Sequence, residues 1–289
     1  MNEHELRKED EGYPKLLREI YDPPPVLYVR GDLQPEERFF AIVGSRRASP
    51  YGLKVASEMA EHLTTYGFTI VSGFARGIDT AAHRGALRAK GRTVAVLGSG
   101  LSKIYPPENR DLANEVSLSG ALVSEFPMTY PVLPENFPRR NRVISGLSLG
   151  VLVVEADEKS GALITADLAL EQGREVFAIP GRVDSPLSRG THRLIQQGAK
   201  LVREVSDILE ELKIPIAEGL TRPASTPRRP PSLVGEEEVV YEYLTDSPKP
   251  IDTIVEETHL SAQKALSTLV QLEVKKLVRE HPGKRYTRA

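Results

Sequence analysis

The sequence predicts a doubly wound α/β domain with a mostly parallel sheet, followed by a small C-terminal winged-helix domain. Within residues 38–213, short runs of consecutive apolar residues alternate with stretches of helical pattern. Strands without alternating polar residues are typical of a parallel sheet that is covered on both faces. Five prolines in residues 214–235 then predict a linker. Residues 236–289 predict three helices and a β-hairpin, in the order that forms a winged helix.

The alternation of strands and helices predicts a sheet of about six or seven strands. The first helix has a clear start, because Ser49 is a favoured N-cap and Pro50 suits the first helical position. We expect strands at residues 39–43, 68–72, 93–97, 121–125, 150–156 and 175–179. We expect helices near residues 50–66, 78–90, 108–119, 138–148, 162–172 and 188–197.

The two ends of the chain depart from this pattern. Residues 1–37 are polar and then rich in proline, so we expect an extended N-terminal segment there. Near the C-terminus, helices are expected at 236–245 and 251–257, and Ser261 is expected to cap a third helix. Two short strands around a Pro-Gly turn complete the predicted winged helix.

Composition narrows the classes of function. With 38 Lys and Arg against 40 Asp and Glu, the net charge of −2 excludes binding of nucleic acid through general basicity. The absence of cysteine excludes disulfides and thiolate sites, and the six scattered histidines predict no metal site. No apolar run reaches the roughly 18–20 residues of a membrane span, and the charged start is not a signal peptide. We therefore expect a cytoplasmic protein without a membrane partner.

Five loops that follow predicted strands are rich in Gly, Ser and Arg. Small residues let main-chain N–H groups approach an anion, and arginine supplies a fork of donors for phosphate. Open α/β sheets bind ligands at the carboxyl ends of their strands, so these loops predict a partner that carries phosphates. The alternative is that Gly and Ser simply form tight turns. The loops span residues 43–49, 72–79, 97–101, 136–142 and 155–165.

The glycine patterns do not favour a nucleotide cofactor. Neither Gly44 nor Gly73 begins a G-x-G-x-x-G run, and Gly98-Ser99-Gly100 lacks the third glycine. A P-loop sequence is also absent. No cofactor is therefore predicted.

Three arginines at the start of one predicted helix are the most specific indication of an anion-binding site. Arg139, Arg140 and Arg142, with Asn141 among them, oppose the partial positive charge of the helix N-terminus. This placement is unfavourable unless an anion binds there. The alternative is a solvated patch or ion pairs with Asp157 or Glu158.

Other residues extend this candidate site. Phe137, just before the cluster, suits stacking on an unpaired base, although most such residues anchor the core. Arg46, Arg47, Arg76 and Lys159 belong to the other loops and are expected along the same rim. For Arg76, an ion pair with Asp79 is the alternative.

Asp79 and His83 stand four residues apart on one predicted helix. The spacing permits an acid–base pair, but no nucleophile motif accompanies it. We favour a structural role, in which Asp79 braces a turn and His83 packs beneath the sheet edge.

At these residues the chain resembles the DNA-processing protein A family (DprA, also called Smf). The similarity covers essentially residues 13–210, and the final unit resembles the winged helix often found at the end of this family. The motifs that carry the resemblance are YPKLLREIYDPPPVLYVRG, VGSRRAS, VSGFARGIDTAAH, YPPEN, SEFP, NFPRRNRVISGLS, VVEADEKSGALITADLALEQGREVFAIPG and GTHRLIQQGA.

The resemblance implies a Rossmann-like domain that binds single-stranded DNA, forms a homodimer and helps load RecA recombinase in natural transformation. It implies no catalytic activity. There are also departures from the family pattern: Ser99 replaces a commoner glycine, FPMTYP lacks the usual glycine after its proline, and residues 1–37 are expected to be a remnant of the family's N-terminal helical domain. The residues predicted to bind DNA are Gly44, Ser45, Arg46, Ser72, Gly73, Arg76, Phe137, Arg139, Arg140, Asn141, Arg142 and Lys159.

The predicted winged helix is not basic. Residues 236–289 contain 8 Lys and Arg against 10 Asp and Glu, and the presumed recognition helix carries only Lys264 and Glu273. We therefore favour a protein contact over reading of duplex DNA. The alternative is a phosphate contact by the wing, through Lys275, Lys276, Arg279, Lys284 and Arg285.

The sequence thus favours a non-enzymatic protein that binds single-stranded DNA. The rival is a nucleotide-processing enzyme resembling the phosphoribohydrolases of the lysine-decarboxylase-like family, whose P-G-G-x-G-T stretch is absent here. A third hypothesis is a scaffold whose arginines bind acidic protein partners.

Overall fold

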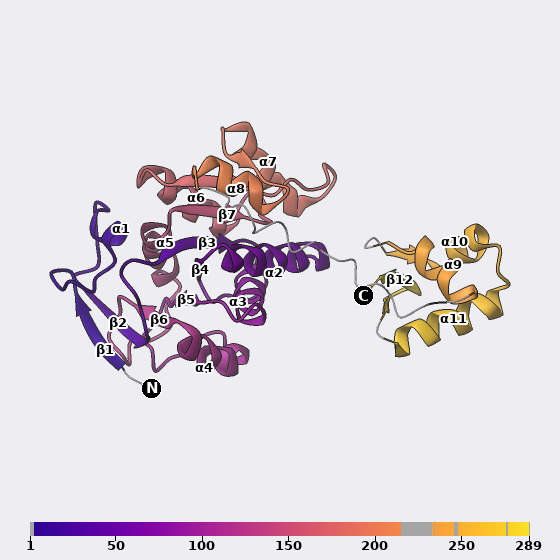
Figure 1. Ribbon diagram of the computed structural model, residues 1–289, viewed down its shortest axis with the longest axis horizontal. Coiled ribbons are helices and arrows are strands. Elements are labelled where there is room, and N and C mark those ends of the chain that lie inside the picture. The colour runs from indigo at the N-terminus through magenta and orange to yellow at the C-terminus, as the bar shows by residue number, and fades with distance from the viewer. Residues whose placement is uncertain (1–2, 215–232, 234, 246–247, 276, 289) are drawn as a thin grey trace. The chain divides into compact units, whose positions relative to one another are not determined.

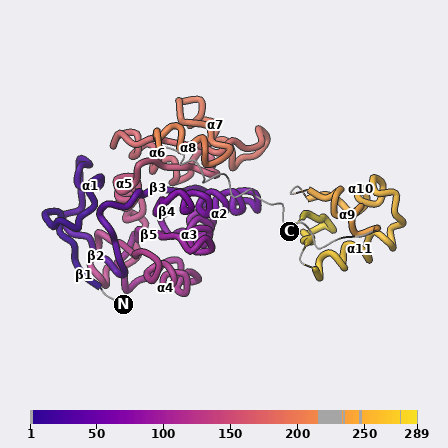
Figure 2. Tube along the Cα trace, viewed as in Figure 1, coloured from indigo at the N-terminus to yellow at the C-terminus, as the bar shows by residue number. Residues whose placement is uncertain are grey.

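The computed structural model describes residues 3–214, 233, 235–245, 248–275 and 277–288 (Figure 1). The chain divides into two compact units, Met1–Ala217 and Glu218–Ala289. Figure 2 traces the same path as a tube. Most of the expected linker, 214–235, lies outside the described residues.

Within the described residues, the larger unit contains a nine-stranded sheet in the order β1-β2-β6-β5-β4-β3-β7-β8-β9. All neighbours from β6 to β9 are parallel, whereas β2 pairs antiparallel with both β1 and β6. The direction of winding reverses between β3 and β7, as in a doubly wound sheet. The strands are β1 (Glu3–Arg7), β2 (Val26–Gly31), β3 (Arg38–Val43), β4 (Phe68–Ser72), β5 (Thr93–Val96), β6 (Ala121–Ser124), β7 (Gly150–Val153), β8 (Glu175–Ala178) and β9 (Lys200–Leu201).

Helices cover both faces of this sheet (Figure 1). On one face α1, α5, α6 and α7 pack against side chains such as Val71 and Val94, and on the other α2, α3, α4 and α8 pack against side chains such as Ile70 and Leu122. The prediction of a mostly parallel α/β sheet is therefore confirmed. The helices are α1 (Lys15–Arg18), α2 (Pro50–Thr65), α3 (Ile78–Arg88), α4 (Arg110–Ser119), α5 (Asn136–Leu147), α6 (Gly161–Glu171), α7 (Arg189–Gln196) and α8 (Val205–Glu211).

The N-terminal residues differ from the extended segment that the sequence suggested, because they contribute β1 and β2 to the same sheet. Tyr13 and Leu17 are fully buried, and the Tyr13 hydroxyl donates to the carbonyl oxygen of Pro24 at 2.8 Å. As the edge strand, β1 keeps its charged side chains largely in solvent. Because β1 contains no apolar run, hydrophobic patterning does not predict it.

The smaller unit is a winged helix, as predicted. Its helices pack around a core that includes Val240, Ile254, Leu269 and Tyr286. Ser261 caps the third helix by accepting a hydrogen bond from the Lys264 main-chain N–H at 3.3 Å. The elements are α9 (Glu236–Tyr243), β10 (Lys249–Pro250), α10 (Ile251–Thr258), α11 (Ala262–Val274), β11 (Val278–His281) and β12 (Arg285–Arg288), and the strands form a sheet in the order β10-β12-β11.

Candidate nucleic-acid interface

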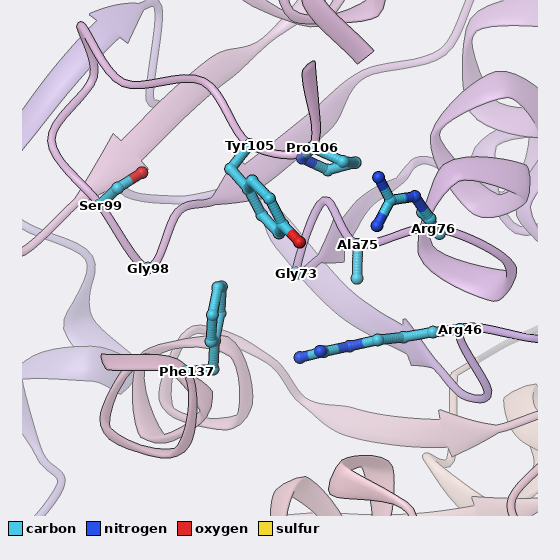
Figure 3. A pocket seen from close by; sticks show the side chains of 9 residues that line it. All are labelled: Arg46, Gly73, Ala75, Arg76, Gly98, Ser99, Tyr105, Pro106 and Phe137. Atoms are coloured by element: carbon cyan, nitrogen blue, oxygen red, sulfur yellow. The ribbon is translucent and has the colours of Figure 1, made fainter. Parts of the chain in front are cut away.

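The five segments singled out in the sequence all lie at one edge of the sheet, because they follow the carboxyl ends of β3 to β7, which are parallel. Residues 136–142 are not a loop, however, but the first part of α5. A pocket opens at this edge (Figure 3). Four of its lining residues were predicted as site residues, whereas Tyr105, Pro106, Ala75, Gly98 and Ser99 were not. The lining residues are Arg46, Gly73, Ala75, Arg76, Gly98, Ser99, Tyr105, Pro106 and Phe137.

Aromatic rings and guanidinium groups alternate around this pocket. The Arg46 guanidinium lies 5.1 Å from the centroid of the Phe137 ring, and the Arg76 guanidinium lies 5.8 Å from that of Tyr105. Figure 3 shows Arg46 extending toward Phe137, with Tyr105 across the pocket. The centroids of the two rings are 6.0 Å apart, and the ring planes are tilted by 45°. Such a surface offers donors for phosphate and π faces for bases.

Arg140, at the heart of the arginine cluster, points into the protein. It is only 4% exposed and donates to the carbonyl oxygens of Gly73 and Val96, the latter at 2.5 Å. Burial lowers the pKa of Arg140 to about 10, with the charge of Asp79 opposing the shift. The side chain is therefore still cationic at neutral pH, and it ties α5 to the ends of β4 and β5.

The two other arginines of the cluster share one carboxylate. Arg139 and Arg142 both bind Glu125, at 2.9 and 2.7 Å, and Arg142 also lies 3.3 Å from Asp22. The Glu125 side chain is 2% exposed, and this burial raises its pKa, against the attraction of the two arginines. The alternative pairing with Asp157 or Glu158 is thus wrong. The side chain of Arg139 is 59% exposed and that of Arg142 is 12% exposed.

Arg76 is held by an acidic residue distant in the sequence. Its guanidinium forms an ion pair with Glu108, in which the second hydrogen bond measures 3.1 Å. This hydrogen bond lowers the pKa of Glu108. The alternative pairing with Asp79 is wrong, because Asp79 accepts from the main-chain N–H of Ala75.

The loop after β3 contributes Arg46 to the pocket, and Arg47 beside it is exposed but does not line the pocket. Ser45 and Ser49, in contrast, are engaged within the protein. The N-terminus of α2 attracts negative charge, and the buried Glu155 carboxylate already occupies it, accepting from the Ser49 N–H at 2.9 Å. Ser45 donates its own N–H to the main-chain oxygen of Glu155 at 2.7 Å. A Cβ atom at Gly44 would lie 2.9 Å from that same oxygen. This turn therefore holds β3 to the loop after β7.

Of the remaining predicted residues, Ser72 and Asn141 have side-chain partners within the protein. Ser72 is buried and its hydroxyl donates to the Ile42 oxygen at 2.6 Å. Asn141 is 8% exposed and donates to the Gly161 oxygen at 3.3 Å. Lys159 is exposed on the loop before α6 and does not line the pocket.

Asp79 and His83 have the structural roles that the sequence favoured. His83 is fully buried beside Phe74, and its Nδ1 lies 2.7 Å from the Thr93 hydroxyl. The Thr93 hydroxyl donates its only proton to the Ile70 oxygen, so His83 Nδ1 must donate to Thr93. Burial lowers the pKa of His83 to about 3, which keeps the ring neutral.

The surface around α11 in the winged helix carries lysines that are already paired with glutamates. Lys264 binds Glu236 at 2.5 Å and Lys275 binds Glu237 at 2.6 Å, while Leu266 is 40% exposed. Of the predicted basic wing, Lys276 lies outside the described residues.

Two kinds of feature are absent from the described residues. These residues contain no group of three His, Cys, Asp or Glu side chains arranged to hold a metal ion. Among the same residues, no helix has the length and apolar character needed to cross a membrane.

Comparisons with known proteins match both units. A model of the family DNA recombination-mediator protein A matches residues 4–213, and the DprA winged helix domain matches residues 224–284. Protein Smf of Escherichia coli is 43% identical over 290 residues, which cover 98% of this chain and 76% of that protein. DNA processing protein DprA of Bacillus subtilis is 48% identical over 202 residues, which cover 69% of this chain and 68% of that protein.

Solved structures agree with this assignment. The X-ray structure of DNA processing protein A from Streptococcus pneumoniae superposes with a TM-score of 0.69 at 43% identity, covering 72% of this chain and 74% of that one. DNA processing protein A from Helicobacter pylori, whose structure is described as revealing a unique single-stranded DNA binding mode, superposes with a TM-score of 0.65 at 30% identity, covering 72% of this chain and 98% of that one. On the evidence of fold, family models and relatives together, the chain belongs to the DNA recombination-mediator protein A family.

Proposed function

We propose that this chain binds single-stranded DNA along the carboxyl edge of its large sheet and does so without acting as an enzyme. The main support is the convergence of Arg46, Arg76 and Phe137 on one pocket, at the edge where open α/β sheets bind ligands. The Helicobacter pylori relative, described as binding single-stranded DNA, adds support.

The proposed DNA residues fall into two groups by exposure. Arg46, Arg76 and Arg139 are exposed, as is Lys159 farther along the edge, and these are proposed to contact phosphates. The buried or largely buried group is proposed to shape the site rather than to contact phosphates through its side chains. This group consists of Gly44, Ser45, Ser72, Gly73, Arg140, Asn141 and Arg142.

Duplex DNA is expected to bind more weakly than a single strand. The bases of a duplex are paired and stacked, so Phe137 cannot reach a base face. A single strand is also more flexible and can follow the loops. The preference then arises from access to bases as well as from charge.

The test is a titration of the full chain with fluorescent oligo-dT at several salt concentrations. Each phosphate that is neutralised contributes a slope of about −0.7 in log K against log salt for single strands. Replacing Arg46 and Arg76 by Ala should weaken binding and reduce the slope by about 1.4. Arg38→Ala is the matched control, because Arg38 is exposed at the opposite end of β3. Equal losses in the control and the double variant would refute the site.

A separate assay tests the alternative hypothesis that the chain is a nucleotide-processing enzyme. The full chain incubated with nucleoside monophosphates should release no free base over hours. Release of base that disappears in the Arg46→Ala, Arg76→Ala variant would favour the nucleotide-processing reaction over the binding function.

We further propose that the chain acts as a cytoplasmic homodimer that helps load RecA onto single strands during natural transformation. Support comes from the family's description as a recombination mediator and from relatives named DNA processing protein. The chain should raise the initial rate of ATP hydrolysis by RecA on single-stranded DNA. Light scattering should give a mass of twice 31.9 kDa in solution. An unchanged rate of ATP hydrolysis by RecA would contradict the loading function. A measured mass equal to that of a single chain would contradict the homodimer.

A further inference from the structure

The loop that follows β3 is fastened at both of its ends by a single residue, Glu155. At the start of the loop, the Ser45 N–H donates to the main-chain oxygen of Glu155 at 2.7 Å. At its end, the Glu155 carboxylate accepts from the Ser49 N–H at 2.9 Å and from the Ser49 hydroxyl at 2.5 Å. Arg46 lies between these two attachments, and it is the residue of this loop that lines the pocket.

Glu155 itself is firmly placed. It follows β7 directly and is only 5% exposed. Its carboxylate lies at the N-terminus of α2, where the partial positive charge of the helix favours an anion and where hydrogen bonds to a charged acceptor are strong. A Cβ atom at Gly52, in the first turn of α2, would overlap this carboxylate, so the glycine leaves the room that the carboxylate fills.

The Arg46 side chain, in contrast, has a weak hold of its own. It is exposed, and its guanidinium lies 5.1 Å from the centroid of the Phe137 ring. A contact of this kind contributes little at an exposed site. The placement of Arg46 therefore depends on the main chain of its loop, and this main chain is held by Glu155.

We propose that Glu155 is a positioning residue for DNA binding, which acts by fixing both ends of the loop that presents Arg46. The inference rests on the proposed single-strand binding and names a buried residue that acts through Arg46. Helix N-termini at this edge of an α/β sheet commonly bind phosphates. Because the Glu155 carboxylate fills the N-terminus of α2, the phosphate of a bound strand is left to the Arg46 guanidinium.

The sign of one substitution distinguishes positioning from simple electrostatics. Glu155→Gln keeps the volume of the side chain and removes one negative charge, which by charge alone would tighten the binding of a polyanion. Positioning predicts the opposite, because the Ser49 hydroxyl loses its carboxylate acceptor and Arg46 is no longer held in place. The full chain with Glu155→Gln should bind oligo-dT about three- to ten-fold more weakly, and its slope in log K against log salt should fall by up to about 0.7.

Asp207→Asn is the matched control. It removes the same charge from another buried carboxylate that accepts main-chain N–H groups at the start of a helix, in this case α8. Asp207 does not line the pocket, so this variant should bind oligo-dT within about two-fold of the wild-type affinity. A double-mutant cycle adds a second comparison: in the Arg46→Ala background, Glu155→Gln should weaken binding no further.

Amide hydrogen exchange tests the same proposal without DNA. The Ser49 N–H should exchange several-fold faster in Glu155→Gln than in the wild-type chain, and Asp207→Asn should leave its exchange unchanged. Thermal unfolding checks that each variant is folded. Should Glu155→Gln fail to fold, Ser49→Ala replaces it, because that variant keeps the carboxylate and removes only the hydroxyl that it binds. Ser49→Ala should weaken oligo-dT binding in the same direction.

The outcomes separate this proposal from the proposed function. If Glu155→Gln binds oligo-dT as tightly as the wild-type chain or more tightly, or if its loss adds in full to that of Arg46→Ala, the positioning role is overturned while single-strand binding stands. Unchanged exchange of the Ser49 N–H would overturn it as well. If the wild-type chain does not bind oligo-dT at all, the proposed function fails, and with it the role of Glu155 in DNA binding.

Discussion

Arg140 donates a hydrogen bond to the main-chain carbonyl oxygen of Gly73, and through it the helix that carries the arginine cluster is tied to the end of β4. The same guanidinium reaches the Val96 oxygen at the end of β5, and it lies 5.8 Å from the Phe137 ring. One buried cation therefore sets the spacing of three parts of the pocket. Asp79, which is 6% exposed, provides nearby negative charge.

Replacing Arg140 by Met should therefore lower stability strongly. The change leaves two buried carbonyl oxygens without this donor and the Asp79 carboxyl without its counter-charge, a type of loss that is worth about 3–5 kcal/mol. Urea unfolding of the two proteins measures the difference. Arg38→Met is the control, because Arg38 is exposed at the start of β3 and its loss should change stability by no more than about 0.5 kcal/mol. Similar stabilities for the two variants would show that Arg140 is not a structural tie.

Glu108 should act as an internal competitor for phosphate. It holds the Arg76 guanidinium in the apo protein, and both side chains are 51% exposed. A phosphate must displace this carboxylate, so Glu108→Gln should tighten binding of oligo-dT by about two- to five-fold at low salt. Fluorescence anisotropy measures the affinity. Asp184→Asn is the control, because Asp184 forms an exposed pair with Arg182 and lies outside the pocket lining. Weaker binding by Glu108→Gln would mean that Glu108 orients Arg76 instead.

His83 should make the fold less stable in acid. Its folded pKa of about 3 lies below the unfolded value of 6.5, so the unfolded chain takes up a proton that the folded chain excludes. The contribution of His83 is therefore fully retained above pH 6.5 and is lost as the pH falls toward 3, by up to about 1.4 kcal/mol per pH unit. The physical reason is that Nε2 is buried without a hydrogen-bond partner.

Unfolding in urea at pH 7.5, 6.0 and 5.0 tests this for the wild-type chain and for His83→Gln. The difference in stability between the two should shrink as the pH falls, because Gln does not titrate. Because the carboxyl groups are the same in both proteins, their contributions cancel in the difference between the two free energies of unfolding. A difference that is constant across this range would mean that His83 becomes protonated without penalty in the folded state.

The sequence predicted the central strands well, because each is a short apolar run buried on both faces, as in β4 with its five buried residues. It did not predict which arginines are buried. Arg139 and Arg140 are neighbours with opposite surroundings, and only the packing of α5 decides between them. The helical spacing nevertheless carries this information. Residues 136, 140, 144 and 147 are three or four positions apart, so they lie on one face of α5, and all four are buried. The apolar Ile144 and Leu147 therefore indicate that Arg140 is on the buried face.

The local sequence pattern could not predict which acidic residues pair with the arginines of the site. Glu108 lies 32 residues from Arg76, and Glu125 lies 14 and 17 residues from Arg139 and Arg142. Helical i, i+3 and i, i+4 rules describe neighbours within one helix. They carry no information on which loops the sheet brings together, so the nearby Asp79 was considered as a partner of Arg76 instead.

Removing Lys264, the lysine of α11, should leave DNA binding unchanged. Lys264, and Lys275 just after the end of α11, are each held by a glutamate of α9, and the surface of α11 also presents Leu266 and Val270, which are 40% and 53% exposed. Lys264→Ala in the full chain should therefore change the affinity for both oligo-dT and a duplex by less than about two-fold, since an already paired surface lysine has little charge to offer a phosphate. A ten-fold loss for the duplex alone would instead identify α11 as a groove-reading helix. In that case the pair with Glu236 must open when DNA binds, and Glu236→Gln should tighten duplex binding.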